Sequence, residues 1–279
     1  MRSVLVTGAS TGIGRATVER LDAAGWRVFA GVRRQEDADA LSQAGSERVM
    51  PLILDVTDAG QIAAAAQRIG EEAGGQLEGL VNNAGIAVPG PLETLPLDDF
   101  RRQVEVNLTA QVAVTQAMLP LLRRAPGRIV FIASIGGRIA FPLNGAYHAA
   151  KFGVEAVGDV FRQELRPWKI GVSIVEPGSI DTPIWERGSA NAEEIEARAH
   201  PDQEALYGRA IAGFRKVVQD LADRGIPPQK VAMVIAHALE ADRPRSRYLV
   251  GLDAKLQARL KVVIPDRVWD RIVARMMHL

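Results

Sequence analysis

A tyrosine and a lysine four residues apart, Tyr147 and Lys151, are the residues of this chain best suited to chemistry. The surrounding pattern predicts a helix over 144–166, and residues at positions i and i+4 of a helix lie on one face. Free tyrosine titrates near about 10, too high to exchange protons readily at neutral pH. A neighbouring ammonium favours the phenolate and lowers that pKa. The pair is therefore a candidate general acid and base, although this spacing is also common by chance.

A second chemical signal lies in the first 14 residues, where a predicted strand over 2–7 leads into a predicted helix over 12–24. The turn between them reads Thr7-Gly8-Ala9-Ser10-Thr11-Gly12-Ile13-Gly14. Glycines let the backbone turn tightly and approach a pyrophosphate, and the helix N-terminus offers free N–H groups and a positive dipole end. In this position the turn favours a dinucleotide site over a purely structural turn.

Composition limits the class of protein. The 279 residues suit one large α/β domain, with hydrophobic residues at 47% and charged residues at 24%. Lysine plus arginine number 34 against 33 acids, which gives no bulk attraction to nucleic acid. The absence of cysteine excludes disulfides, thiolate zinc sites and cysteine nucleophiles. His200, His237 and His278 lack ligand spacing, so no metal site is expected.

Hydropathy bears on localisation in the same way. No apolar run reaches the roughly 18 residues that a membrane span requires. The first apolar run, within residues 1–6, is too short for the core of a signal peptide. We therefore expect a cytoplasmic protein.

Short apolar runs alternate with longer helical segments, which predicts an α/β fold with a doubly wound parallel sheet and helices on both faces. The predicted strands are 2–7, 26–32, 49–54, 78–82, 127–133, 170–175 and 247–250. The predicted helices are 12–24, 58–73, 97–123, 144–166, 202–223 and 228–240. One catalytic domain is expected over 1–251, with the irregular segment 183–215 as a substrate-binding lobe and 252–279 as a helical extension.

Further motifs occur in order along the chain. They are Asn82-Asn83-Ala84-Gly85 after the fourth strand, Asn107 in the next helix, Ser134 ending the fifth strand, and Pro177-Gly178 after the sixth, with Thr182 beyond. With the glycine turn and the Tyr147/Lys151 pair, they resemble the short-chain dehydrogenase/reductase family over roughly residues 1–250. The resemblance implies a Rossmann-fold oxidoreductase that uses NAD(H) or NADP(H). The stretch 134–165 is most similar to members that act on steroids, retinoids and other lipid-like carbonyls.

The resemblance also implies a catalytic tetrad. Ser134 would donate a hydrogen bond to the substrate oxygen. Tyr147 would give that oxygen a proton during reduction or remove one during oxidation. Lys151 would lower the pKa of Tyr147 and hold the nicotinamide ribose hydroxyls, and Asn107 would order a water that joins Lys151 to solvent. His148 points about 100° away from Tyr147 on a helix and is expected to pack.

The end of the second strand bears on cofactor choice. It reads Gly31-Val32-Arg33-Arg34, without the carboxylate that would bind the adenosine ribose and favour NAD. Val32 stands where the family's NAD-selective aspartate would be expected, and Arg33 could pair with a 2′-phosphate. We therefore predict NADP(H) over NAD(H). The alternative is that both arginines face solvent, and Thr11 stands where some NADP-dependent relatives carry a basic residue.

The remaining site residues follow from the same resemblance. The predicted cofactor site comprises Gly8, Ser10, Thr11, Gly12, Ile13, Gly14, Arg33, Asp55, Val56, Asn83, Ala84, Gly85, Asn107, Tyr147, Lys151, Pro177, Gly178, Ile180 and Thr182. Asp55 would contact the adenine or serve as an ordinary turn residue or helix cap. The predicted substrate residues are Ser134, Ile135, Gly136, Phe141, Asn144 and Tyr147. The expected pocket is mostly apolar, which indicates a hydrophobic alcohol or ketone.

The tail carries two amphipathic patterns separated by Pro265. The first places Leu252, Leu256, Leu260 and Val263 on one helix face. The second places Arg267, Arg271 and Arg275 on one face and Trp269, Val273 and Met276 on another. A basic amphipathic helix can contact a membrane surface, pack on its own domain or a partner subunit, or form a lid. We favour packing or a lid.

The leading functional hypothesis is an NADP(H)-dependent carbonyl reductase or alcohol dehydrogenase. The alternative from another class is a non-catalytic dinucleotide sensor on the same fold, although such proteins usually lose the tyrosine or lysine of the active-site helix. An epimerase or dehydratase of the extended branch would need a larger C-terminal domain than roughly 30 extra residues supply. Family members are commonly dimers or tetramers through the helices here placed at 97–123 and 144–166, so a homodimer or homotetramer is expected.

Overall fold

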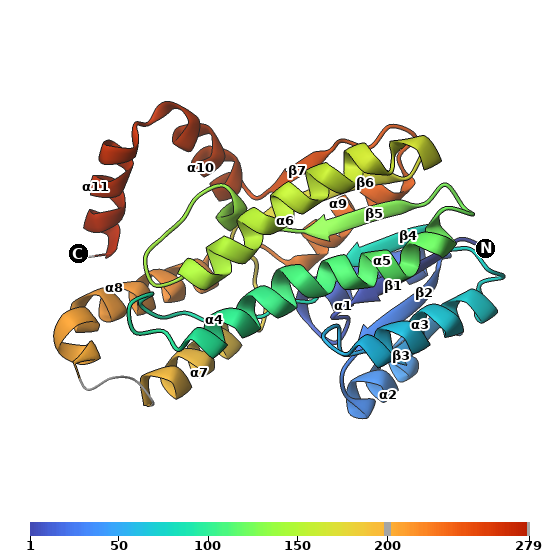
Figure 1. The fold of residues 1–279 in the computed structure, drawn as a ribbon, viewed down its shortest axis with the longest axis horizontal. Coiled ribbons are helices and arrows are strands. Elements are labelled where there is room, and N and C mark those ends of the chain that lie inside the picture. Colours follow the sequence, from blue (N-terminus) through green and yellow to red (C-terminus); the bar gives the residue numbers. More distant parts are fainter. Residues whose placement is uncertain (198–201, 278–279) are drawn as a thin grey trace.

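The computed structural model, which describes residues 1–197 and 202–277, is built on a seven-stranded parallel sheet (Figure 1). Its strands are β1 (Ser3–Thr7), β2 (Arg27–Val32), β3 (Val49–Ile53), β4 (Gly79–Asn82), β5 (Arg128–Ile132), β6 (Gly171–Pro177) and β7 (Arg247–Val250). The spatial order is β3-β2-β1-β4-β5-β6-β7, so the direction of winding reverses between β1 and β4. Ligands of such sheets bind beyond the carboxyl ends of the strands at this reversal. The predicted Rossmann-type fold and its seven strands are confirmed.

The helices cover both faces of the sheet. They are α1 (Gly12–Ala23), α2 (Gln35–Ala44), α3 (Ala59–Glu72), α4 (Leu97–Val104), α5 (Ala110–Leu122), α6 (Gly145–Glu164), α7 (Ile184–Ala197), α8 (Gln203–Asp223), α9 (Pro228–Glu240), α10 (Leu252–Val263) and α11 (Asp266–Met277). Three short helical segments are the π-helical η1 (Glu105–Thr109) and the 3-10 turns η2 (Ile135–Gly137) and η3 (Arg166–Trp168).

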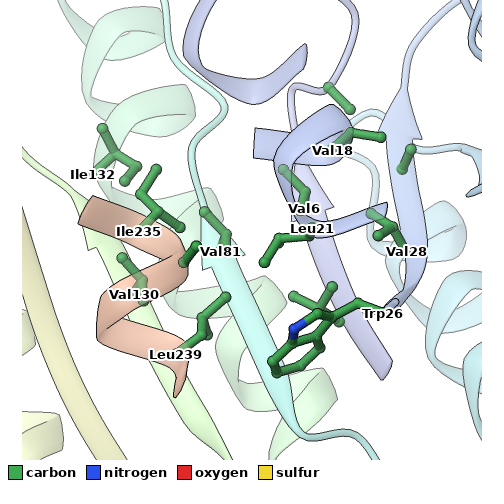
Figure 2. Close-up of a cluster of buried hydrophobic side chains, with 14 of the residues drawn as sticks. Val6, Val18, Leu21, Trp26, Val28, Val81, Val130, Ile132, Ile235 and Leu239 are labelled. Carbon is green, nitrogen blue, oxygen red and sulfur yellow. The ribbon is translucent and has the colours of Figure 1, made fainter. Parts of the chain in front are cut away.

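Two apolar layers hold the sheet between the helices. Figure 2 shows the first layer, where Leu21 of α1 and Ile235 of α9 meet Val6 and Val81 of the central strands. The second layer joins α3, α5 and α6 to the opposite face. Strands buried on both faces need continuous apolar runs, which explains why they stood out in the sequence. The core therefore fixes the strand ends at which the site is built.

The helix predicted over 97–123 is interrupted. Between α4 and α5 the chain makes a π-helical turn, η1, in which the Ala110 N–H donates to the Glu105 carbonyl. A π turn adds one residue to the helical repeat and commonly marks a functional position. The polar Asn107 lies inside it and is fully buried. The sequence pattern did not reveal this insertion because the buried residues of α4, Asp99 and Gln103, are polar and set no apolar register with α5.

Two further differences between the predicted and the observed helices concern segments rich in polar residues. Helix α2 was not predicted, because only Ala38 and Leu41 of its ten residues are buried and its apolar periodicity is weak. The segment 183–215 was expected to be irregular up to the helix predicted over 202–223, which is present as α8, whereas α7 was not predicted. These helices stand beside the sheet rather than upon it, so few apolar positions mark them. Residues 198–201, which include His200, and residues 278–279, which include His278, lie outside the described residues.

The tail packs on its own domain. Helix α10 buries its small side chains Ala254 and Ala258, and α11 buries Trp269, Val273 and Met277. Met276, which the sequence pattern grouped with Trp269, is exposed instead. Figure 1 shows the two helices as an arch beyond the end of the sheet, with α11 returning beside α8.

Candidate active site

The glycine turn connects β1 to α1 and has the shape that the sequence indicated. Gly12 has φ +55°, a conformation that favours glycine. A Cβ at Gly14 would collide with the Gly8 carbonyl oxygen, so this close approach also requires glycine. Thr11 precedes α1 without capping it, and among the described residues no side chain caps the first N–H groups. The turn therefore leaves a helix N-terminus free to bind a phosphate.

Asn83 locks this turn to the neighbouring strand. Its Nδ2 donates to the Thr7 carbonyl at 2.9 Å and to the Gly8 carbonyl at 3.1 Å. The Thr7 hydroxyl in turn accepts from the backbone N–H groups of Asn83, at 3.0 Å, and Ala84, at 3.1 Å. The side chain of Asn83 thus holds the turn in place.

The loop after β6 also lies beside the glycine turn. It comes from the other half of the sheet, beyond the reversal of winding between β1 and β4. A Cβ on Gly12 would lie 3.0 Å from the Thr182 side chain, so this loop adjoins the glycine turn. The Ile180 carbonyl accepts from the Trp185 indole at 2.8 Å, and the Asp181 N–H donates to Ile226 at 3.0 Å. These bonds fix the loop beside the turn.

Asp253, the second residue of α10, is a functional candidate that sequence reasoning missed. Its carboxylate accepts from the Ser179 N–H at 2.7 Å and lies so close to Gly178 that a Cβ there would collide with it. Gly251, with φ +107°, turns the chain so that the carboxylate can approach. The signal available in the sequence was an aspartate in the first turn of a helix just after a strand and a glycine. The tail therefore helps to hold the loop after β6.

Ser134 and Tyr147 meet beyond the carboxyl end of β5. Ser134 precedes η2, and its hydroxyl accepts from the Gly136 N–H at 3.0 Å. Burial raises the pKa of the Tyr147 phenol above its usual 10.0, and a hydrogen bond from Ser134 opposes that rise. A serine hydroxyl and a protonated phenol thus converge on one position where a substrate oxygen can bind.

In this structure Lys151 is turned towards the end of β5, and the lowering of the Tyr147 pKa by Lys151 stays a prediction. Lys151 Nζ donates to the Ile132 carbonyl at 2.8 Å and lies 5.7 Å from the centre of the Tyr147 ring. A carbonyl at the end of β5 competes for the ammonium, so the pKa of Tyr147 is raised by burial rather than lowered by charge. Burial also lowers the pKa of Lys151 to about 8, with Glu155 acting in the opposite direction.

Both polar atoms of the Asn107 side-chain amide form hydrogen bonds with the backbone of Ile86. Its Oδ1 accepts from the Ile86 N–H at 2.8 Å, and its Nδ2 donates to the Ile86 carbonyl at 3.0 Å. The π turn η1 thus holds the segment that follows β4. The water relay to Lys151 that the resemblance implies stays a prediction.

His148 supports the wall of the site. Its Nδ1 lies 2.9 Å from the Gly136 carbonyl, and its Nε2 accepts from the Phe141 N–H at 3.0 Å. A carbonyl on one side and an N–H on the other require the neutral ring with its proton on Nδ1. Burial lowers the pKa of His148 and favours the same form. The residue therefore braces the loop from Gly136 to Phe141.

Arg33 and Arg34, which follow the end of β2, differ in the contacts that they make. Arg34 pairs with Asp37 at 3.2 Å. Arg33 is exposed and makes no ion pair or hydrogen bond within the described part of the chain, which leaves its guanidinium available to an anion. Asp55 accepts from the Thr57 N–H and hydroxyl at 2.9 and 2.8 Å, an ordinary turn arrangement.

A cavity of about 260 Å³ lies between the loop after β4, the segment Leu143–Asn144 and the helices α7 and α8. Its lining is mostly apolar and includes Ala87, Leu143, Ile184, Trp185, Ile211 and Phe214. Of the predicted substrate residues, Asn144 lines it, whereas Ser134, Ile135, Gly136, Phe141 and Tyr147 do not. Phe141 packs against the ring of Trp269 in α11 instead, with centroids 6.3 Å apart.

In the ranges 1–197 and 202–277, no three or more His, Asp or Glu side chains gather as they would around a metal ion. No helix in those ranges combines the length and the apolar character that crossing a membrane requires.

The fold, the phosphate-binding turn and the Ser134–Tyr147 pair define a Rossmann-type oxidoreductase site. A family model described as short chain dehydrogenase matches residues 2–193. The chain therefore belongs to the short-chain dehydrogenase family, as the resemblance implied, and is an oxidoreductase that acts on CH–OH or C=O groups.

Individual proteins resemble the chain over nearly its whole length. It is 38% identical to retinol dehydrogenase 5 of Mus musculus, over 97% of this chain and 87% of that protein. It is 34% identical to the NADPH-dependent 3-dehydrocapnine reductase of Ornithobacterium rhinotracheale, over 98% and 96%. Among solved structures, a short-chain dehydrogenase from Streptomyces avermitilis superposes with a TM-score of 0.79 at 31% identity, over 97% and 94%. One from Burkholderia cenocepacia in complex with NADP gives 0.72 at 26%, over 99% of both chains.

Asp253 supplies a test of how the site is held. Asp253→Ala removes a charged acceptor from the Ser179 N–H, a bond worth about 1.5–3 kcal/mol. We expect the KM for the dinucleotide to rise about tenfold, with a smaller change in kcat. Asp253→Asn keeps an acceptor oxygen and should restore most of the affinity.

The control is Asp270→Ala, because Asp270 is an exposed aspartate on α11 in the same tail. Steady-state kinetics and thermal unfolding would be measured for all four proteins. An equal loss of thermal stability without any change in dinucleotide KM would show that Asp253 acts on folding alone.

Proposed function

We propose that this protein interconverts a hydrophobic ketone or aldehyde and its alcohol, with NADP(H) preferred over NAD(H) as the hydride carrier and Tyr147 as the general acid and base. The observation that carries the proposal is the hydrogen bond between the Ser134 hydroxyl and the Tyr147 phenol beyond the carboxyl end of β5. One position can thereby receive both a hydrogen bond and a proton.

The residues present fit a dinucleotide. The turn from Gly8 to Gly14 and the uncapped N-terminus of α1 would hold the pyrophosphate. Arg33 would hold the 2′-phosphate, and the loop through Ile180 and Thr182 would hold the nicotinamide end. When bound, the cofactor supplies or accepts the hydride. The relative named as NADPH-dependent and the solved relative in complex with NADP support this choice of cofactor.

The electrostatics of the chain favour proton donation at neutral pH. The raised pKa keeps the Tyr147 phenol protonated, ready to donate to a developing alkoxide. Ser134 orients the same oxygen by a hydrogen bond. Lys151, with a pKa of about 8, is mostly charged at neutral pH and places an ammonium within the buried site.

The substrate class rests on the cavity. Its mostly apolar lining suits a molecule with a large hydrophobic part, and Asn144 adds a polar group near the catalytic helix. The names of relatives, which include retinol dehydrogenases and a 17-beta-hydroxysteroid dehydrogenase, support a lipid-like carbonyl or alcohol.

The quaternary structure follows from the same family. A homodimer or homotetramer would use the surface of α5 and α6, and exposed apolar residues on α6, Phe152 and Val160, support that arrangement. Localisation in the cytoplasm stays a prediction.

Tyr147→Phe removes the proton donor while keeping the ring. We expect the rate of NADPH consumption with a panel of hydrophobic ketones and aldehydes to fall about 10²–10⁴-fold. NADPH binding, measured by fluorescence, should change little. Tyr248→Phe, at a tyrosine on β7, is the matched control and should keep wild-type activity. A wild-type protein that binds NADPH but consumes none on any substrate would favour the sensor alternative.

The buried lysine predicts a pH dependence. Burial lowers the pKa of Lys151 from 10.5 to about 8, so its ammonium is present below that pH and is lost above it. Initial rates of carbonyl reduction should therefore be steady below pH 8 and decline above it. Lys151→Arg keeps its charge throughout, so its profile, at a lower absolute rate, should lack this decline. The same decline in both proteins would assign it to another group.

Arg33 and Arg34 form a matched pair for testing cofactor choice. Arg33→Ala should lower kcat/KM for NADPH about tenfold or more, because hydrogen bonds to a charged group contribute about 1.5–3 kcal/mol. The value for NADH should stay near that of the wild type. Arg34→Ala should have a weaker effect, since Arg34 already pairs with Asp37. A wild-type preference for NADH would refute the role given to Arg33.

A further inference from the structure

One face of α10 exposes apolar side chains at helical spacing. Leu252, Leu256 and Val263 are 85%, 58% and 73% exposed, and Leu260 between them is 37% exposed. Residues four and three apart form one stripe along a helix. The opposite face is already used, because Ala254 and Ala258 are buried. The stripe is therefore left uncovered by the other residues that the structure describes.

Helix α11 repeats this arrangement. Val268, Ile272 and Met276 follow one another at intervals of four and are 43%, 46% and 42% exposed. Its inner face, through Trp269 and Val273, packs on the domain. The outer apolar residues of both helices thus lie on the arch that Figure 1 shows beyond the end of the sheet.

Basic side chains accompany both stripes. They are Lys255, Arg259, Arg267, Arg271 and Arg275, all exposed. None makes an ion pair within residues 1–197 and 202–277, whereas Lys261 pairs with Asp266 at 2.6 Å. Each of the three arginines of α11 directly precedes an exposed apolar residue. The exposed apolar residues of both helices and these five basic residues together form what we call the tail surface. It comprises Leu252, Lys255, Leu256, Arg259, Leu260, Val263, Arg267, Val268, Arg271, Ile272, Arg275 and Met276.

The basic residues of the tail surface distinguish between two partners that could cover it, a second copy of the chain and a lipid bilayer. In a symmetric dimer the same patch meets itself, which would bring the unpaired arginines of one copy towards those of the other. An anionic bilayer instead offers acyl chains to the apolar residues and phosphates to the basic ones. We propose that the tail surface docks on the interface of an anionic lipid bilayer, with the arch lying on the membrane and no segment crossing it. This proposal is independent of the reaction that the active site performs.

Co-sedimentation of the full-length protein with lipid vesicles tests the proposal. The vesicles are pure phosphatidylcholine or an equal mixture of phosphatidylcholine and phosphatidylglycerol. We expect the protein to sediment with the mixed vesicles, to bind pure phosphatidylcholine more weakly, and to lose binding as salt rises, because salt screens the arginines. A protein that stays in the supernatant with both vesicles would overturn the proposal.

Two sets of substitutions separate the apolar and the basic contributions. Replacing Leu252, Leu256 and Val263 together by serine should lower binding to the mixed vesicles about tenfold or more. Replacing Arg267, Arg271 and Arg275 by glutamine should lower it about tenfold and remove most of the salt dependence.

The matched control is a triple serine variant at Ile53, Leu97 and Met233, which are 43%, 59% and 55% exposed and lie outside the tail. It should bind like the wild type, and circular dichroism should show that all variants fold. Equal loss of binding in the control would overturn the proposal. The proposal would also be overturned if the wild type did not bind vesicles and light scattering showed a dimer that dissociates when Leu252, Leu256 and Val263 are replaced by serine.

Discussion

The hydrogen bonds of Asn83 and Thr7 across the ends of β1 and β4 are the constraint on which the rest of the site depends. β1 and β4 are paired in parallel, and the sheet reverses its winding between them, so a crevice opens beyond their carboxyl ends. The Asn83 amide binds two carbonyls of the glycine turn, and Thr7 binds two N–H groups of the next segment. Backbone polar groups that would otherwise need water are thereby satisfied, and the turn is held at one distance from β4.

The acid and base chemistry stands on a second rigid frame, helix α6. Tyr147, His148 and Lys151 leave it in different directions and are each fixed by a separate contact: Ser134, the loop from Gly136 to Phe141, and the Ile132 carbonyl. Their pKa values shift because all three are buried, which removes water from the charged forms. Residues on one helix thus supply the proposed proton donor, a brace and a buried cation because their partners differ.

Prediction from sequence succeeded where local pattern and function coincide. The five inner strands were recognisable because each is an apolar run buried on both faces, and the glycine turn because its spacing is dictated by backbone geometry. The π turn at Asn107, the carbonyl that binds Lys151 and the contact of Asp253 with Ser179 all depend on which residues meet across the fold. A single sequence does not contain those pairings. Helices α2 and α7 were missed for a different reason, since few of their residues face the core.

The tail connects the active-site framework to the exposed surface of the protein. Its inner side holds Asp253 against the loop after β6 and packs Trp269 on Phe141, whereas its outer side carries the tail surface. Helix α8 continues the connection, because Phe214 both lines the cavity and packs in the cluster that contains Trp269. Deleting residues 252–279 would therefore disturb the loop after β6 and the cavity wall together with any membrane contact. Substitutions confined to the outer side are the only way to change one property of this segment without changing the other.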